Sequence, residues 1–332
     1  MDFIIPASYE GHLLRSYLLD ELQLSARLLS ALKQHPSGIL LDGERVTVRA
    51  KLHSGAHLQL AIESITPTHV GCILPAVPSI PLQILYEDDD VTVCAKPAGM
   101  PTHPSHGHFT DTLANALAHR ELMRTACTTG NKPFVFHPIS RLDRNTSGTV
   151  LVARHALAAH RLCDAMMAGD IHKTYLALLL GVPAQRKGDI ITGIRRREQS
   201  VITREITDVG AAGADRAHTR YEVLSTFPAP AALPLPPAYR DARISLVRAH
   251  PLTGRTHQLR LHFAHIGAPI LGDELYGAGN LPLCMERHAL HSLALSFPHP
   301  RTGNRVEITA PLPDDMRAWL PSDTALDMTT VG

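Results

Sequence analysis

Arg141-Leu142-Asp143-Arg144-Asn145-Thr146-Ser147-Gly148 is followed directly by the apolar run Thr149-Val150-Leu151-Val152-Ala153. An apolar, β-branched run behind a turn predicts a buried strand. We therefore expect Asp143 on a turn that leads into a rigid element, which suits a group that must be held in place. The same loop also has the composition of a salt-bridged surface turn, and the eight residues alone do not decide between the two interpretations.

The composition limits the classes of function. The chain has 332 residues, which favours two domains, and its 44% hydrophobic and 19% charged residues are typical of a soluble globular protein. The net charge of +1 provides no global attraction for a polyanion, so any nucleic-acid site must be a local basic patch. No apolar run reaches membrane-spanning length and the N-terminus has no basic leader, which predicts a cytoplasmic protein without membrane contact.

Metal and nucleotide sites are not indicated. The five cysteines are odd in number and widely scattered, which predicts reduced thiols that mostly pack in the interior. The 21 histidines show no His-x-x-x-His pair on an apolar helix, and no glycine-rich phosphate loop is present. We therefore expect neither a metal nor a cofactor.

Residues 1–64 are predicted to form a small α/β module. Two helices are expected within residues 11–35, the second capped by Ser25, followed by a hairpin at 38–48 with an Asp42-Gly43 turn and a strand at 58–62. Through Leu24 to Arg27, Gly43 and Gly55, the stretch resembles the small RNA-binding module first described in a ribosomal protein of the small subunit, the "S-four" type. This resemblance implies that Arg27 contacts RNA. Acids are as frequent as bases here, so a protein-contact role stays open.

The remainder is predicted as a proline-containing linker (65–81), a catalytic domain (82–320) and a C-terminal tail (321–332). The acidic turn Asp88–Asp90 is expected to be solvated. Strands alternate irregularly with helices, which favours an α+β fold with a mixed, largely antiparallel sheet. The predicted strands are 84–88, 91–95, 149–153, 173–180, 220–224 and 244–248, the predicted helices begin at 111 and 156, and a proline-rich loop is expected at 225–241.

Several further stretches occur together in a fixed order. They are Lys96-Pro97-Ala98-Gly99, the loop around Asp143, Lys173-Thr174-Tyr175, Leu252 to His262, Pro269 to Asp273 with Tyr276, and Ala289 to Ser292. In this order and spacing they resemble the RNA pseudouridine synthases, specifically the large branch that acts on ribosomal and transfer RNA uridines. The match covers residues 82 to about 316.

The resemblance implies isomerisation of uridine in a structured RNA, with ribosomal RNA favoured over transfer RNA. The sequence does not fix the oligomeric state, for which a monomer is the default expectation. The reaction breaks the N1–C1′ bond, turns the base and joins C5 to C1′, so it needs no redox change, metal or phosphate energy. It needs an ionised carboxylate in a pocket that shields the base. The residues do not tell whether that carboxylate attacks the sugar, attacks the ring or abstracts a proton.

The resemblance places the carboxylate at Asp143, its guanidinium partner at Arg255 on a strand entering the site, and the stacking ring at Tyr175. Arg255 could instead form a structural ion pair, and Tyr175 could be a surface tyrosine of the sheet. Leu259 is the expected apolar wall. The candidate RNA contacts are Arg141, Arg144, Arg260, Lys96 and Arg195 to Arg197.

Two other classes of function remain. A catalytically silent RNA chaperone or assembly factor would bind RNA without using Asp143, Tyr175 and Arg255 together. A metal-dependent hydrolase built from the histidines is the third interpretation, and insensitivity to chelators would remove it.

Overall fold

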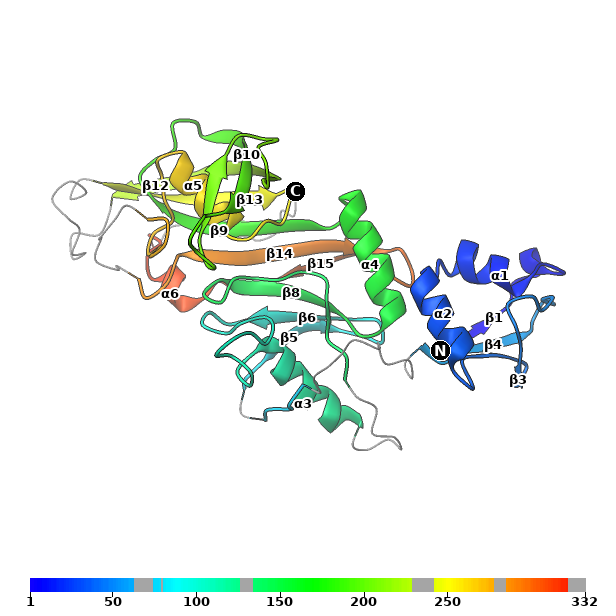
Figure 1. The fold of residues 1–332 in the computed structure, drawn as a ribbon. Coiled ribbons are helices and arrows are strands. Elements are labelled where there is room, and N and C mark those ends of the chain that lie inside the picture. Colours follow the sequence, from blue (N-terminus) through cyan, green and yellow to red (C-terminus); the bar gives the residue numbers. More distant parts are fainter. Residues whose placement is uncertain (63–73, 79, 126–133, 229–241, 278–284, 322–332) are drawn as a thin grey trace.

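The computed structural model describes residues 1–62, 74–78, 80–125, 134–228, 242–277 and 285–321. These residues form a small N-terminal module and a larger body built on one long sheet, with the module beside helix α4 (Figure 1). None of the described helices is long and apolar enough to cross a bilayer.

The N-terminal module has a four-stranded sheet in the order β1-β4-β2-β3, with its helices packed on apolar side chains. The predicted cap of α2 is confirmed, because the Ser25 hydroxyl accepts a hydrogen bond from the Leu28 amide at 3.2 Å. Asp42 (φ 52°) and Gly43 (φ 83°) form the predicted hairpin turn. The elements are β1 (Asp2–Ile4), η1 (Ala7–Tyr9), α1 (Leu14–Ser16), η2 (Tyr17–Glu21), α2 (Ala26–Gln34), β2 (Ile39–Leu41), β3 (Glu44–Arg45) and β4 (His57–Leu60).

The second hairpin strand is shorter than predicted. It ends at Arg45 rather than continuing through Val48. The carbonyls of Val48 and Ala50 instead accept hydrogen bonds from Arg15 and Leu14 at 2.9 and 2.8 Å, and these bonds hold the first turn of α1. Backbone groups used in this way are no longer available to extend the ladder.

The larger body is an 11-stranded sheet whose strands pair antiparallel except for β14 with β8, which confirms the predicted α+β class. Its path is β11-β10-β12-β13-β9-β14-β8-β6-β5, with β15 on β14 and β7 on β8. The strands are β5 (Gln83–Glu87), β6 (Val91–Lys96), β7 (His137–Pro138), β8 (Ser147–Ala153), β9 (His172–Leu180), β10 (Lys187–Arg196), β11 (Arg204–Thr207), β12 (Asp215–Pro228), β13 (Arg243–Pro251), β14 (Leu290–Pro298) and β15 (Arg305–Thr309). The helices are α3 (Leu113–Thr125), α4 (Ala156–Ala168), α5 (Gln258–His265) and α6 (Asp314–Arg317).

Two predicted elements differ in the structure. The strand expected to carry Arg255 is a turn followed by helix α5. Residues 258–263 are all buried, so this helix lacks the exposed polar face by which a helix is usually recognised in a sequence. The predicted proline-rich loop begins inside β12, which continues to Pro228. Its remainder (229–241), the linker residues 65–73 and 79, and the tail residues 322–332 lie outside the described residues.

Strand β8 fixes the end of the Asp143 loop. All seven of its residues are buried, and it lies between β6 and β14. Gly148 has φ +117°, and a Cβ at this position would overlap the Ser292 backbone of β14. Only glycine therefore allows the two strands to approach this closely.

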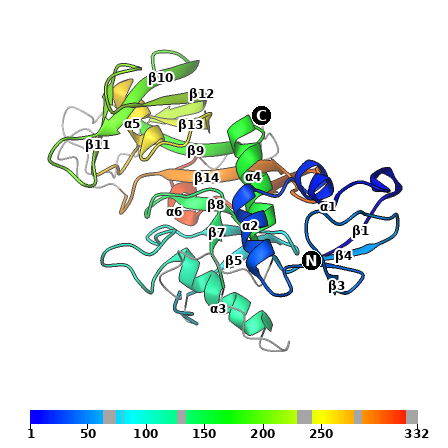
Figure 2. The same cartoon turned by 45° about the vertical axis from the view of Figure 1, so that its right-hand side comes forward.

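The N-terminal module is fastened to α4 (Figure 2). The Leu157 side chain of α4 is part of the module's own apolar core. Arg161, one turn further on, donates hydrogen bonds to the carbonyls of Leu22 at 3.2 Å and of Pro300 at 2.8 Å. One helix thus links the module to the turn that follows β14.

Replacing Gly148 by alanine should destabilise the protein by about 3 kcal/mol or more, because the new methyl group meets backbone that cannot move aside. Gly107→Ala is the matched control, since Gly107 has φ +80° but open space around it, and it should cost only about 1 kcal/mol. Urea unfolding of both variants provides the comparison. Equal midpoints would show that the close approach of β8 and β14 is not a constraint.

Candidate active site

The backbone on both sides of Asp143 is clamped. The Thr102 hydroxyl donates to the Leu142 carbonyl at 3.0 Å and accepts from the Leu142 amide at 3.3 Å. On the other side, the Lys96 ammonium donates to the Arg144 carbonyl at 3.0 Å. Two polar groups from an adjacent segment therefore hold the residues before and after the carboxylate.

Lys96 is buried, with 1% of its surface exposed. Besides Arg144, its ammonium donates to the carbonyls of Pro97 and Met100 at 2.9 and 2.8 Å, so its three protons all have acceptors. Burial lowers its pKa to about 7, and the nearby charge of Asp143 opposes that shift. The predicted contact between Lys96 and RNA is therefore wrong, because its charged end is used inside the protein.

The loop is also tied to the strand behind it. The Thr146 hydroxyl lies 2.8 Å from Nε2 of His288, and the Ser147 hydroxyl lies 2.9 Å from Nδ1 of His291. Burial lowers the pKa of His288 to about 3 and that of His291 to about 4, so both rings are neutral near neutral pH. Neutral imidazoles thus anchor the loop without adding charge beside Asp143.

The Asp143 carboxylate faces Arg260 and His257. Its Oδ2 atom lies 3.8 Å from Nη1 of Arg260 and 4.0 Å from Nε2 of His257. The Asp143 side chain is 24% exposed, whereas that of Arg260 is 4% exposed. The carboxylate is therefore open to solvent on one side and flanked by buried donors on the other.

Arg260 is held by a second carboxylate. Its Nε and Nη2 atoms donate to the two oxygens of Asp273, each at 2.7 Å, and the Asp273 side chain has no exposed surface. Burial opposes the charge of Arg260, but Asp273 and then Asp143 raise its pKa. Its guanidinium carbon also lies 5.2 Å from the ring centre of Tyr276. Arg260 is thus a fixed cation.

Tyr175 and Leu259 provide the apolar part of the site. Tyr175 is 8% exposed and Leu259 is 6% exposed, and both belong to the cluster that includes Leu142. Burial and the charge of Asp143 raise the pKa of Tyr175 to about 12, although a hydrogen bond with Ser292 opposes this. Tyr175 is therefore a neutral phenol near neutral pH, electrostatically coupled to Asp143.

Comparison with known proteins identifies the family. The family model described as RNA pseudouridylate synthase matches residues 90–265, more than half of the chain. An uncharacterised RNA pseudouridine synthase of Bacillus subtilis, YjbO, is 35% identical over 296 residues, 89% of this chain and 94% of the relative. Ribosomal large subunit pseudouridine synthase D of Xanthomonas campestris is 36% identical over 290 residues, 84% of this chain and 78% of the relative.

The chain belongs to the RNA pseudouridine synthase family. It is therefore an enzyme of the class that isomerises uridine in RNA. The solved structure of human RNA pseudouridylate synthase domain containing 1 agrees, with a TM-score of 0.55 and 27% identity over 78% of this chain and 94% of the human chain. The region matched by the family model includes Asp143, Tyr175 and Arg260 and ends before Asp273.

The structure places the synthase's predicted guanidinium partner elsewhere. Nη1 of Arg255 lies 3.6 Å from Oδ1 of Asp215, its side chain is 42% exposed, and among the described residues it forms no ion pair with Asp143. Arg260, predicted as an RNA contact, is instead the cation beside Asp143. The predicted pairing of Arg255 with the carboxylate is therefore wrong, and so is the predicted contact of Arg260 with RNA, because the Arg260 side chain is buried between Asp273 and Asp143.

The other predicted RNA contacts are exposed. Arg141 and Arg144 belong to the same loop as Asp143. Arg141 donates to the Thr256 hydroxyl at 3.1 Å, and Arg144 donates to the Gly99 carbonyl at 3.1 Å. Arg27 is exposed on α2 of the N-terminal module. Along β10, Arg195 pairs with Glu205 at 2.7 Å, while Arg196 and Arg197 are exposed.

Two residues of the site had no specific role in the sequence analysis, Asp273 and Tyr276. Asp273 accepts hydrogen bonds from Arg260, and the Tyr276 hydroxyl lies 2.8 Å from Nδ1 of His257. Asp273 and Tyr276 occur within the family motifs, but their partners become visible only after α5 folds. The spacing of His257 and Arg260 is the usable signal, since the residue that precedes a helix and the residue three further on lie close together, as in a capping box.

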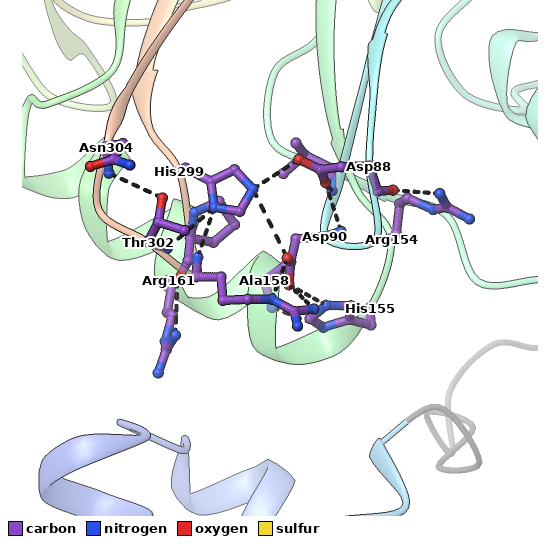
Figure 3. Close-up of polar contacts among 12 residues, drawn as sticks. Asp88, Asp90, Arg154, His155, Ala158, Arg161, His299, Thr302 and Asn304 are labelled. Atoms are coloured by element: carbon purple, nitrogen blue, oxygen red, sulfur yellow. Dashed lines mark hydrogen bonds and ion pairs between the residues drawn. The ribbon is translucent and has the colours of Figure 1, made fainter. Parts of the chain in front are cut away.

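A second group of titratable residues lies between β5 and the turn after β14 (Figure 3). Nε2 of His299 lies 2.9 Å from Oδ2 of Asp88, and Nε2 of His155 lies 3.0 Å from Oδ1 of Asp90. Asp90 is 5% exposed and also pairs with Arg301 at 2.7 Å. The prediction of a merely solvated acidic turn is therefore wrong.

This second group is an ion-pair network rather than a prepared metal site. Nδ1 of His299 accepts the Arg301 amide at 3.2 Å, and Nδ1 of His155 accepts the Ala158 amide at 3.1 Å. Each Nε2 then carries the ring proton and donates to its carboxylate, so neither has a lone pair for a cation. Burial alone would raise the pKa of Asp88, but hydrogen bonds led by that from Tyr86 lower it to about 2.

Proposed function

We propose that the protein converts specific uridines of a structured RNA to pseudouridine, with Asp143 as the catalytic carboxylate. The supporting observation is the contact of Asp143 with the buried cation of Arg260, beside the ring of Tyr175 and the wall of Leu259. The reaction needs an ionised carboxylate next to an apolar surface for the detached base.

Arg260 would compensate the negative charge of Asp143 when the RNA covers the site. Water that solvates the carboxylate is then excluded, and the fixed guanidinium 3.8 Å away provides the opposite charge. Because Arg260 is already oriented by Asp273, it needs no rearrangement as the substrate binds. Tyr175, a neutral phenol, is suited to stack on the uracil ring.

The target base must leave its stack to reach Asp143, because the carboxylate lies between protein elements. Arg141 and Arg144 are placed to hold phosphates or to fill the vacated position, since both are exposed and flank Asp143 in the chain. Leu259 would bound the pocket from the side of α5.

We further propose large-subunit ribosomal RNA as the substrate, with transfer RNA as the alternative. Support comes from relatives named ribosomal large subunit pseudouridine synthase D in Xanthomonas campestris, at 36% identity, and in Pseudomonas aeruginosa, at 32% identity. The N-terminal module would add an RNA contact through Arg27, in line with its resemblance to ribosomal RNA-binding modules. We also propose that the protein acts in the cytoplasm.

Asp143→Asn should abolish tritium release from unmodified large-subunit ribosomal RNA that contains 5-tritiated uridine. The amide keeps the shape of the side chain but removes its charge, so RNA affinity should change little. Asp164→Asn, at an exposed position of α4 where the side chain is 46% exposed, is the matched control and should react as the wild type does.

Full turnover by Asp143→Asn would remove the assigned role of this residue. Tight, salt-sensitive RNA binding by the wild type, without tritium release from any cellular RNA, would instead favour the RNA-chaperone alternative.

Arg260→Lys and Arg255→Lys test which arginine serves Asp143. Lysine cannot reproduce the paired hydrogen bonds with Asp273, so Arg260→Lys should lower the single-turnover rate by roughly 10- to 100-fold. Arg255→Lys alters an exposed ion pair and should change that rate by less than about threefold. Thermal unfolding checks that both variants fold, and a larger loss for Arg255→Lys would reverse the assignment.

A further inference from the structure

The Tyr276 hydroxyl links the start of β11 to the side chain of His257. Its oxygen accepts a hydrogen bond from the Arg204 amide at 2.8 Å and lies 2.8 Å from Nδ1 of His257. A backbone amide can only donate, so the hydroxyl is the acceptor in the first of these bonds. The direction of the second bond decides which nitrogen of His257 carries the ring proton.

Two considerations place that proton on Nε2. If Nδ1 of His257 donated to Tyr276, the phenolic proton would have no acceptor among these partners of a half-buried hydroxyl. In addition, Nε2 faces Oδ2 of Asp143 at 4.0 Å, and a bare lone pair there would face a negative oxygen. Tyr276 therefore donates to Nδ1, and His257 presents an N–H to Asp143.

The charges around His257 agree with a neutral ring. Its side chain is 11% exposed, and burial lowers its pKa, with Asp143 opposing this shift and Arg260 and Arg204 adding to it. Asp273, in the turn after α5, weakly favours the protonated form of His257. His288, which faces His257 from the segment before β14, is itself neutral. A donor from Tyr276 at Nδ1 disfavours a second ring proton as well.

We propose that His257 is a positioning residue for the reaction, which directs its Nε2–H to Oδ2 of Asp143 in a tautomer fixed by Tyr276. This inference rests on the proposed role of Asp143. The described contacts of Asp143 with the Arg260 guanidinium and with the His257 ring are both made through Oδ2. The geometry thus leaves Oδ1 to act on the substrate.

The 4.0 Å separation is longer than a hydrogen bond. Contacts of catalytic groups are commonly long without substrate and shorten in the complex. The contacts through Tyr276 and His257 also connect the carboxylate to the hairpin between β10 and β11, because the Arg204 amide belongs to the first residue of β11. RNA that contacts the exposed Arg196 and Arg197 would therefore lie against the same unit that orients His257.

Tyr276→Phe removes the hydroxyl but keeps the ring beside Arg260. We expect the single-turnover rate of tritium release from large-subunit ribosomal RNA with 5-tritiated uridine to fall about tenfold or more, with RNA affinity unchanged. Without the donor at Nδ1, His257 takes up a second proton more readily. Its pKa rises, so the acid limb of the pH–rate profile should move to higher pH.

Tyr221→Phe is the matched control. This variant removes the hydroxyl of a tyrosine on β12, which donates to the Gln185 carbonyl at 3.2 Å and has no described contact with Asp143. Its rate and pH profile should equal those of the wild type.

A second pair of variants separates positioning from backbone geometry. His257 has φ +58°, a conformation that asparagine tolerates better than glutamine. The glutamine amide, however, reaches the place of Nε2, and the shorter asparagine amide does not. His257→Gln should therefore retain a higher single-turnover rate than His257→Asn, although it is the less stable variant in thermal unfolding.

The outcomes separate this inference from the proposed function. No tritium release by the wild type from any cellular RNA means that the proposed function fails. Release by the wild type, with Tyr276→Phe equal to Tyr221→Phe in rate and pH profile, overturns the role of His257. A faster His257→Asn than His257→Gln overturns it as well, because only the turn would then matter.

Discussion

The site depends on one cation shared by two carboxylates. Arg260 is bound through two hydrogen bonds to the fully buried Asp273 and still faces Asp143 at 3.8 Å. A buried guanidinium is stable only when its charge is compensated, so the Asp273 pair makes it possible to keep Arg260 next to the partly exposed carboxylate of Asp143. The hydrogen bonds from Lys96 to the Arg144 carbonyl and from Thr102 to the Leu142 carbonyl hold the backbone so that Asp143 faces that cation.

Histidines are oriented in the same way at two places in the molecule, around Asp90 and at Asp143. Around Asp90, the rings of His299 and His155 each accept a backbone amide at Nδ1 and direct Nε2–H to a carboxylate. In the network around Asp90 this produces a rigid link between α4, β5 and the turn after β14, close to where Arg161 fastens the N-terminal module. At Asp143, a tyrosine replaces the backbone donor, which makes the contact responsive to the position of β11.

The sequence was sufficient for the Asp143 loop and the buried strand behind it, because an unbroken β-branched run has few other uses. It was insufficient for the choice between Arg255 and Arg260. Both lie in the same short motif, and only the fold of α5, which places His257 and Arg260 one turn apart on one side, shows which faces the carboxylate. The prediction for Lys96 was wrong for a related reason. A lysine that donates only to backbone carbonyls cannot be distinguished from a surface lysine by its neighbours in the sequence.

The most direct test replaces Asp143 by asparagine in the chromosomal gene and maps pseudouridine across the cellular RNA of that strain and of its parent. Catalysis by a charged Asp143 beside Arg260 predicts that at least one pseudouridine, in large-subunit ribosomal RNA, is lost while the protein is still produced at its normal level. Identical maps from the two strains would contradict the account.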